Sequence, residues 1–182
     1  MYEKVLVTLD GSDLAEAALP YVRELSEVLG SELHMLGVCD EPRLPERLMQ
    51  AYVDRLASQY VRAGLKAKAV VLCGMAENVI VSYAEENGVS LIAMATHGRS
   101  GISRWILGSV VDKVIHASPV PLFIINSKLA KEGRVTRRAF RRLLLPLDGS
   151  EVGEAALPVT EELARKTNAR LLLLTVTPPA SR

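Results

Sequence analysis

The 182-residue sequence predicts an α/β protein built on a doubly wound, five-stranded parallel sheet. Two observations lead to this fold class. Short apolar runs alternate with segments of helical periodicity along the first 126 residues, which is typical of repeated β-α units. The apolar runs are also continuous, as expected for strands that are covered on both faces. Right-handed crossovers then favour a flavodoxin-like sheet, in which ligands bind outside the carboxyl ends of the strands.

The first half of the chain predicts three β-α units. Ser12 or Asp13 can cap the first helix, and Gly30 ends it as a C′ residue. Gly64 and Gly88 end the other two helices in the same way. The predicted strands are Lys4–Leu9, Leu33–Val38 and Ala67–Leu72, and the predicted helices are approximately Leu14–Leu29, Glu46–Ala63 and Ala76–Asn87.

The next segment completes the sheet. We predict a fourth strand at Val89–Met94, a helix at Gly108–Ala117 and a fifth strand at Leu122–Ile125. Pro119 and Pro121 prevent the helix from continuing into the last strand. The expected domain therefore covers residues 1–127.

A basic stretch, residues 128–139, is interpreted as a linker, because such charge runs are usually solvated rather than bound to nucleic acid. The chain then repeats itself. Asp148–Pro158 parallels Asp10–Pro20, and strands are expected at Leu143–Pro146 and Leu171–Val176. Residues 140–182 thus predict a partial β-α-β copy of the first domain, without the later strands.

The segment Leu91–Ser109 has the parts of a phosphate-binding loop. An apolar strand runs into a glycine-containing loop, and a helix begins after Gly108. Backbone amides and the positive end of a helix dipole converge at such a place. Asp10 and Val38 follow or end two other strands at the same predicted edge of the sheet. We interpret this edge as an anion site, most simply for a nucleotide.

Other interpretations of these residues remain open. Asp10-Gly11-Ser12 could be a turn and helix cap alone, since the motif recurs at Asp148. His97 has no matching carboxylate or nucleophile nearby in sequence, so a hydrogen-bond donor near phosphate is favoured over a catalytic base. Ser100 and Ser109 lack a partner base, which argues against nucleophilic catalysis.

Composition excludes few functions. The 22 basic and 21 acidic residues nearly balance, so nucleic acid is not an expected partner. No apolar run approaches membrane-spanning length, and the chain enters a strand directly without an export signal, which favours a cytoplasmic protein. Cys39 and Cys73 lack metal-ligand spacing and are expected to be buried thiols rather than a disulfide.

Three stretches carry a family resemblance: VLVTLDGSDLAEAAL, ENGVSLIAMATHGRSG and GSVVDKVIHASPVPLFII. Through them residues 1–126 resemble a universal stress protein domain of the ATP-binding type, and the tail from about Phe140 resembles the first third of a second one. The resemblance implies an adenine nucleotide alpha hydrolase-like, Rossmann-like fold. It also implies a motif in which Gly-x-x-Gly is followed by a spacer of nine residues and then by Gly-Ser or Gly-Thr. Here that motif begins at Ala95, where alanine replaces the first glycine, and ends at Gly108-Ser109.

The resemblance implies a nucleotide site formed by the ends of the predicted strands, by the loop that follows Ala95 and by the start of the helix at Gly108. Asp10 would lie on the adenosine side, Val38 would line the adenine pocket, and Gly108 would let the backbone approach phosphate oxygens. The full expected set is Thr8, Leu9, Asp10, Val38, Met94, Ala95, His97, Gly98, Arg99, Ser100, Gly108, Ser109 and Val110.

The expected function is an ATP- or adenine-nucleotide-binding regulatory or sensing module in the stress response. Mg²⁺ or Mn²⁺ would enter with the phosphates, because no metal cluster is encoded. A homodimer through Leu122–Ile125 is expected, with exchange of the tail as a further option. The alternative is a scaffold that acts through protein contacts and binds no nucleotide. The alanine at position 95, in place of the motif's first glycine, favours this alternative. A slow ATPase is less favoured, because no base is identified.

Overall fold

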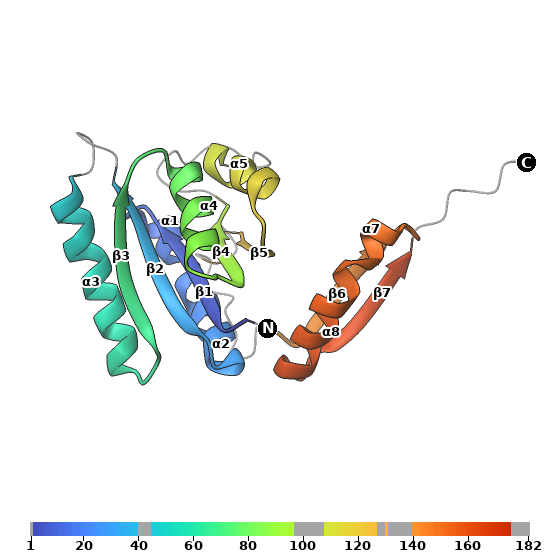
Figure 1. Cartoon of the computed structure of the whole chain (residues 1–182). Coiled ribbons are helices and arrows are strands. Elements are labelled where there is room, and N and C mark those ends of the chain that lie inside the picture. Colours follow the sequence, from blue (N-terminus) through green and yellow to red (C-terminus); the bar gives the residue numbers. More distant parts are fainter. Residues whose placement is uncertain (1, 40–44, 97–107, 127–129, 131–139, 176–182) are drawn as a thin grey trace, which may run out of the picture. The chain divides into compact units, whose positions relative to one another are not determined.

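A computed structural model describes residues 2–39, 45–96, 108–126, 130 and 140–175 (Figure 1). The chain divides into two compact units, Met1–Val135 and Thr136–Arg182. Each unit is described by itself.

The first unit contains a five-stranded sheet in the order β3-β2-β1-β4-β5, in which every neighbouring pair is parallel. This confirms the predicted doubly wound α/β class. The strand order is the Rossmann-like one and differs from that of flavodoxin, where β1 and β3 are neighbours. The direction of winding reverses between β1 and β4, so the switch point lies there. The strands are β1 (Lys4–Leu9), β2 (Glu32–Cys39), β3 (Ala67–Cys73), β4 (Leu91–Ala95) and β5 (Leu122–Ile125).

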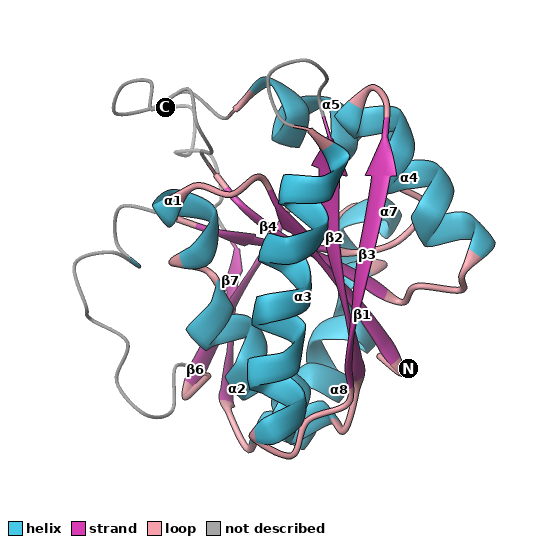
Figure 2. Cartoon of the chain, turned by 90° about the vertical axis from the view of Figure 1, so that its left-hand side faces the viewer, coloured by secondary structure: helices cyan, strands magenta, loops and turns pink. Residues whose placement is uncertain are grey.

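Helices cover both faces of this sheet. The α3 helix runs along one face, as Figure 2 shows, and α4 and α5 lie together on the other (Figure 1). On the α3 side, a Cβ built at Gly37 of β2 would lie 2.5 Å from Met49 Sδ, so glycine lets the helix approach the strand closely. The helices are α1 (Asp13–Glu16), α2 (Leu19–Leu29), α3 (Glu46–Arg62), α4 (Ala76–Glu86) and α5 (Ser109–Ala117).

The predicted single helix over Leu14–Leu29 is wrong, because it is divided into α1 and α2. Ala17 caps the end of α1 and Ala18 precedes α2. Pro20, in the first turn of α2, has no amide hydrogen to donate to the carbonyl of Glu16, so a continuous helix would lose that bond. The short α1 follows the carboxyl end of β1 and contacts both β1 and β4.

The two cysteines form a disulfide, so the expectation of free thiols is wrong. Cys39 and Cys73 are the last residues of β2 and β3 and lie directly opposite each other in the register, with Cα atoms 4.6 Å apart. The 34-residue separation gave no sign of this arrangement. The pairing of β2 with β3, and the fact that both strands end at the same pair of residues, are decided by the sheet as a whole. The local sequence does not reveal them.

The second unit is a β-α-β piece. Its strands β6 (Arg142–Leu147) and β7 (Arg170–Thr175) pair in parallel, and α7 (Glu151–Glu154) and α8 (Ala156–Thr167) connect them. Leu144, Leu172 and Leu174 are 60%, 43% and 44% exposed. Their counterparts in the first unit, Leu6, His34 and Leu36, are fully buried. The described residues of the second unit therefore leave one apolar face of its sheet open.

Among the described residues, no helix combines the length and apolar character needed to cross a membrane.

Candidate functional site

The switch point of the sheet lies between the ends of β1 and β4. Val5 and Val7 pair with Leu91 and Ala93, and the same register continued by two residues brings Leu9 level with Ala95. Asp10 and Thr96 therefore leave neighbouring strands side by side. In doubly wound sheets this crevice is where ligands bind.

Four of the predicted site residues are the last residues of these two strands. Leu9 and Met94 are each only 3% exposed, and Met94 belongs to the apolar core that α4 and α5 cover. Thr8 and Ala95 are half-buried. Leu9 and Met94 are thus core residues at the strand ends, while Thr8 and Ala95 retain some accessible surface.

Asp10 organises the turn that follows β1. Its Oδ1 accepts hydrogen bonds from the Ser12 amide at 3.0 Å and from Ser12 Oγ at 2.6 Å. Ser12 Oγ in turn accepts from the Ala15 amide at 3.2 Å and so caps α1. Gly11 between them has a φ of 80°, which favours glycine. The turn places the Asp10 carboxylate at the carboxyl edge of the sheet.

The repeated motif at Asp148 has the same local geometry. Asp148 Oδ1 accepts from the Ser150 amide at 2.9 Å and from Ser150 Oγ at 2.7 Å. These bonds hold the pKa of Asp148 below its ordinary value. The turn-and-cap role is therefore inherent in the Asp-Gly-Ser sequence, and any ligand role of Asp10 is additional to it.

Val38 lies next to Asp10 across the β1–β2 ladder. Leu9 pairs with Gly37, so the following residue of each strand is Asp10 and Val38 respectively. Val38 is half-buried and packs on the apolar core of the α4–α5 face. The structure thus brings together the acidic and apolar residues that were predicted from separate strands.

Gly108 brings the chain back to the end of β4, on the other side of the crevice. Its amide donates to the Thr96 carbonyl at 2.9 Å, and the Thr96 amide donates to the Ile125 carbonyl at 2.9 Å. A Cβ at Gly108 would lie 3.0 Å from the Thr96 carbonyl oxygen, closer than side chains usually come. Residues 97–107 fall outside the described residues, and with them the predicted His97, Gly98, Arg99 and Ser100.

Helix α5 begins directly after the bond between Gly108 and Thr96. Its N-cap, Gly108, provides no side-chain hydrogen bond, and the Asp112 amide makes the first-turn bond to the Gly108 carbonyl at 2.9 Å. The amides of Ser109, Val110 and Val111 lie before Asp112 in the first turn, where a helix offers no carbonyl for them to bond. Such amides, together with the helix dipole, favour an anion at this end of a helix.

Ala95 occupies an ordinary strand position. It is the last residue of β4, pairs with Ile125 and does not have a positive φ. The backbone conformation at this position therefore does not require glycine. The replacement of the motif's first glycine by alanine costs no backbone strain.

Tyr52 was missed by sequence reasoning. Its Oη is buried and has no hydrogen-bond partner among the described residues. The guanidinium of Arg55 lies 5.6 Å from the ring centre and 3.7 Å from a carboxylate oxygen of Glu16 on α1. Burial raises the pKa of Tyr52, and the carboxylates of Glu16 and Asp10 raise it further. Tyr52 thus lies close to the Asp10 side of the crevice, a position that depends on how α3 packs on the sheet.

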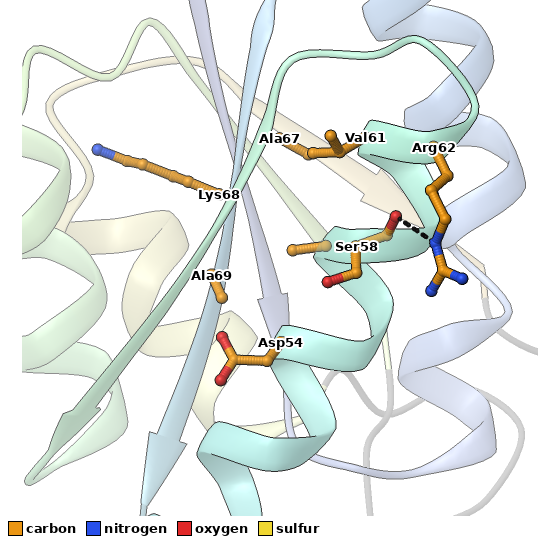
Figure 3. A pocket seen from close by; sticks show the side chains of 8 residues that line it. Asp54, Ser58, Val61, Arg62, Ala67, Lys68 and Ala69 are labelled. Carbon is orange, nitrogen blue, oxygen red and sulfur yellow. Dashed lines mark hydrogen bonds between the residues drawn. The ribbon is translucent and has the colours of Figure 1, made fainter.

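A separate pocket of about 560 Å³ lies between α3 and β3 (Figure 3). Asp54, Arg62 and Lys68 are among its lining residues, and the guanidinium Nε of Arg62 donates to the Ser58 carbonyl at 3.2 Å. Its strand residues, Ala67–Ala69, are at the amino end of β3. The pocket is therefore at the opposite edge of the sheet from the candidate site.

Among the residues that the structure describes, no group of three or more histidine, cysteine or acidic side chains could hold a metal ion.

Comparison with known proteins agrees with this fold. A model described as the universal stress protein family matches residues 1–126. Universal stress protein MJ0577 of Methanocaldococcus jannaschii is 26% identical over 157 residues, covering 70% of this chain and 97% of that protein.

Solved structures give the same result for the fold. The structure of a universal stress protein in complex with cAMP matches with a TM-score of 0.57 and 21% identity, over 69% of this chain and 98% of that one. A universal stress protein from Archaeoglobus fulgidus matches all of this chain and 70% of its own length, with a TM-score of 0.79 and 24% identity.

Proposed function

Because the chain belongs to the universal stress protein family, we propose that it binds ATP or a related adenine nucleotide and acts as a regulatory or sensing module in the stress response. One observation carries the proposal. Asp10, Val38 and the N-terminus of α5 meet at the switch-point edge of a single sheet. Acidic, apolar and anion-binding groups at one edge suit a ligand that has hydroxyl donors, an aromatic base and phosphates. The cAMP complex of a relative supports the same ligand class.

In the proposed binding mode, the amides at the start of α5 and the hydroxyl of Ser109 hold phosphate oxygens. The close approach of Gly108 to Thr96 keeps those amides at the crevice. Asp10 accepts hydrogen bonds from ligand hydroxyl or amine groups, and Val38 packs against the base. By family resemblance, the remaining phosphate contacts come from Gly98, Arg99 and Ser100, with His97 as a donor.

Mg²⁺ or Mn²⁺ would enter with the nucleotide and neutralise charge on the phosphates. The residues described here fit that role through the Ser109 hydroxyl and bound water, without a preformed acidic cluster. Nucleotide occupancy would then order the site and shift the equilibrium between conformations of the module.

We also propose a homodimer in the cytoplasm, formed through β5. Among the described strands β5 is the last in the sheet order, and the proposed dimer pairs its outer edge with that of a second copy. Substituting Phe123, which is half-buried and not part of the apolar cluster on the α4–α5 face, by lysine should lower the mass measured by light scattering from dimer to monomer. An unchanged mass would argue for a different interface, such as exchange of the second unit.

The function is tested by calorimetric titration of the full chain with ATP and Mg²⁺. Asp10→Asn keeps Oδ1 as an acceptor for Ser12 but removes the charge, and Gly108→Val pushes a side chain against Thr96. Both changes should weaken binding. Asp148→Asn alters the same turn in the second unit and should leave binding unchanged. Absence of heat with the wild-type protein at millimolar ATP would overturn the proposal.

A further inference from the structure

The disulfide between Cys39 and Cys73 lies at the same edge of the sheet as the candidate site. Cys39 follows Val38 directly, and both cysteines end their strands at the carboxyl side. The register places the two residues opposite each other on neighbouring parallel strands. A covalent bond here ties β2, whose Val38 lies beside Asp10, to its outer neighbour β3.

The two sulfurs differ in accessibility. Cys39 is 1% exposed, whereas Cys73 belongs to the exposed residues at the end of β3. Gly74 and Met75, which follow Cys73, are exposed as well. Thiol–disulfide exchange requires in-line access of a thiolate to one sulfur of the bond. A reductant can therefore approach Cys73 from solvent, while Cys39 is shielded.

The backbone ladder of β2 and β3 extends to Cys39 and Cys73 themselves, so the bridge lies at the last pair of that ladder. The Gly74 amide lies 3.5 Å from the Cys39 carbonyl oxygen, a long hydrogen bond. The bridge is thus a covalent link, added to the backbone bonds, at the last pair of the ladder and next to Val38. Breaking it would leave this strand end held by backbone bonds alone, and ends of strands open more readily than their middles.

We propose that Cys39 and Cys73 form a reversible redox site, attacked at Cys73 by dithiol reductants, that controls the affinity of the crevice for its nucleotide. The control of affinity rests on the proposed function, whereas the redox chemistry stands independently of it. The oxidised form holds the end of β2 in place. It binds the nucleotide more tightly, because the free-energy cost of ordering this strand end on binding is smaller.

The chemistry balances with a dithiol as the reductant. One thiolate of the dithiol attacks the Cys73 sulfur, the bond to Cys39 breaks, and the Cys39 thiolate takes up a proton. The second thiolate then attacks the reductant's own sulfur in the mixed disulfide and releases Cys73, which is also protonated. Two electrons and two protons pass to the protein, and the dithiol leaves as a disulfide. Oxidised glutathione reverses the sequence, with exposed Cys73 attacking first and Cys39 resolving the mixed disulfide.

The redox part is tested on the full chain by alkylation. The protein is equilibrated with dithiothreitol or with oxidised glutathione, treated with N-ethylmaleimide and weighed by mass spectrometry. The sequence contains two cysteines, so every adduct is assignable. We expect no adduct after oxidation and, after reduction, an adduct at Cys73 well before one at Cys39. Alkylation of both cysteines in oxidised glutathione, or resistance of the folded protein to dithiothreitol, would overturn the proposal.

The control of affinity is tested by titrating both redox forms with ATP and Mg²⁺. We expect roughly two- to tenfold weaker binding after reduction, the effect of ordering one or two additional side chains. Cys73→Ser changes the exposed partner and should bind like the reduced protein in both buffers. Equal affinities of the two wild-type forms would overturn the control of affinity. If neither form binds ATP, the proposed function fails, and the alkylation result still decides the redox site.

Discussion

Removal of the disulfide should measurably destabilise the first unit. Cys73→Ser replaces an exposed sulfur, so it removes the cross-link without opening a cavity in the core. A cross-link between residues 34 apart restricts the unfolded chain by a loop entropy that corresponds to about 3.8 kcal/mol at 25 °C. Residual structure in the unfolded chain reduces this value, so we expect a loss of about 3 kcal/mol in the free energy of unfolding.

The measurement is a urea titration of oxidised wild type and Cys73→Ser. With a slope of about 2 kcal/mol per molar urea, the midpoint should fall by roughly 1.5 M. Dithiothreitol provides the control, because reduced wild type and Cys73→Ser should then unfold at the same midpoint. Cys39→Ala should cost more than either, since it also leaves a cavity at a buried position. Coinciding midpoints for oxidised wild type and Cys73→Ser would refute the reasoning.

Three further predictions follow from single side chains. His34 is fully buried, and burial, followed by the charge of Lys68, lowers its pKa below the ordinary 6.5, so the unfolded chain binds a proton first as pH falls. Stability should therefore decrease from pH 7 to pH 5 in urea titrations, and His34→Gln should flatten that dependence; an equally steep slope in the variant would contradict this. The 2.6 Å ion pair of Lys113 with Glu77 lowers the pKa of Glu77, and Glu77→Gln should cost at most about 1 kcal/mol at pH 7 and nothing well below pH 4.5. Tyr52→Phe should leave thermal stability nearly unchanged, because its hydroxyl has no partner among the described residues, whereas Tyr60→Phe removes a 3.0 Å bond to the Leu19 carbonyl and should cost about 1 kcal/mol.

The sheet was predictable because its signals are local. Continuous apolar runs, glycine stops and prolines between Ala117 and Leu122 mark elements without knowledge of the rest of the chain. The Ser12 cap was also predictable, since a hydroxyl three residues before a free amide forms its bond within one turn. The bounds of β4 were less accurate: Val89 ends the turn after α4 by donating to the Ala84 carbonyl, and the strand begins at Leu91.

The parts that depend on strand order were not predictable in the same way. Which strands are neighbours decides whether Cys39 meets Cys73, and no local pattern encodes this. The position of Tyr52 near Asp10 depends likewise on how α3 packs across the sheet. Ala95 shows the reverse case. The motif has a glycine at this position, but the ordinary strand conformation of Ala95 does not require one.

The division into two units also determines what spectroscopy can observe. All five tyrosines and the single tryptophan of the sequence fall within Met1–Val135, and Thr136–Arg182 contains neither residue type. The tyrosine and tryptophan bands of near-ultraviolet circular dichroism and of intrinsic fluorescence therefore report on the first unit, whereas far-ultraviolet dichroism sums the backbone of both. Non-coincident melting curves from the two spectral ranges would resolve independent unfolding of the second unit without a label or a truncated chain.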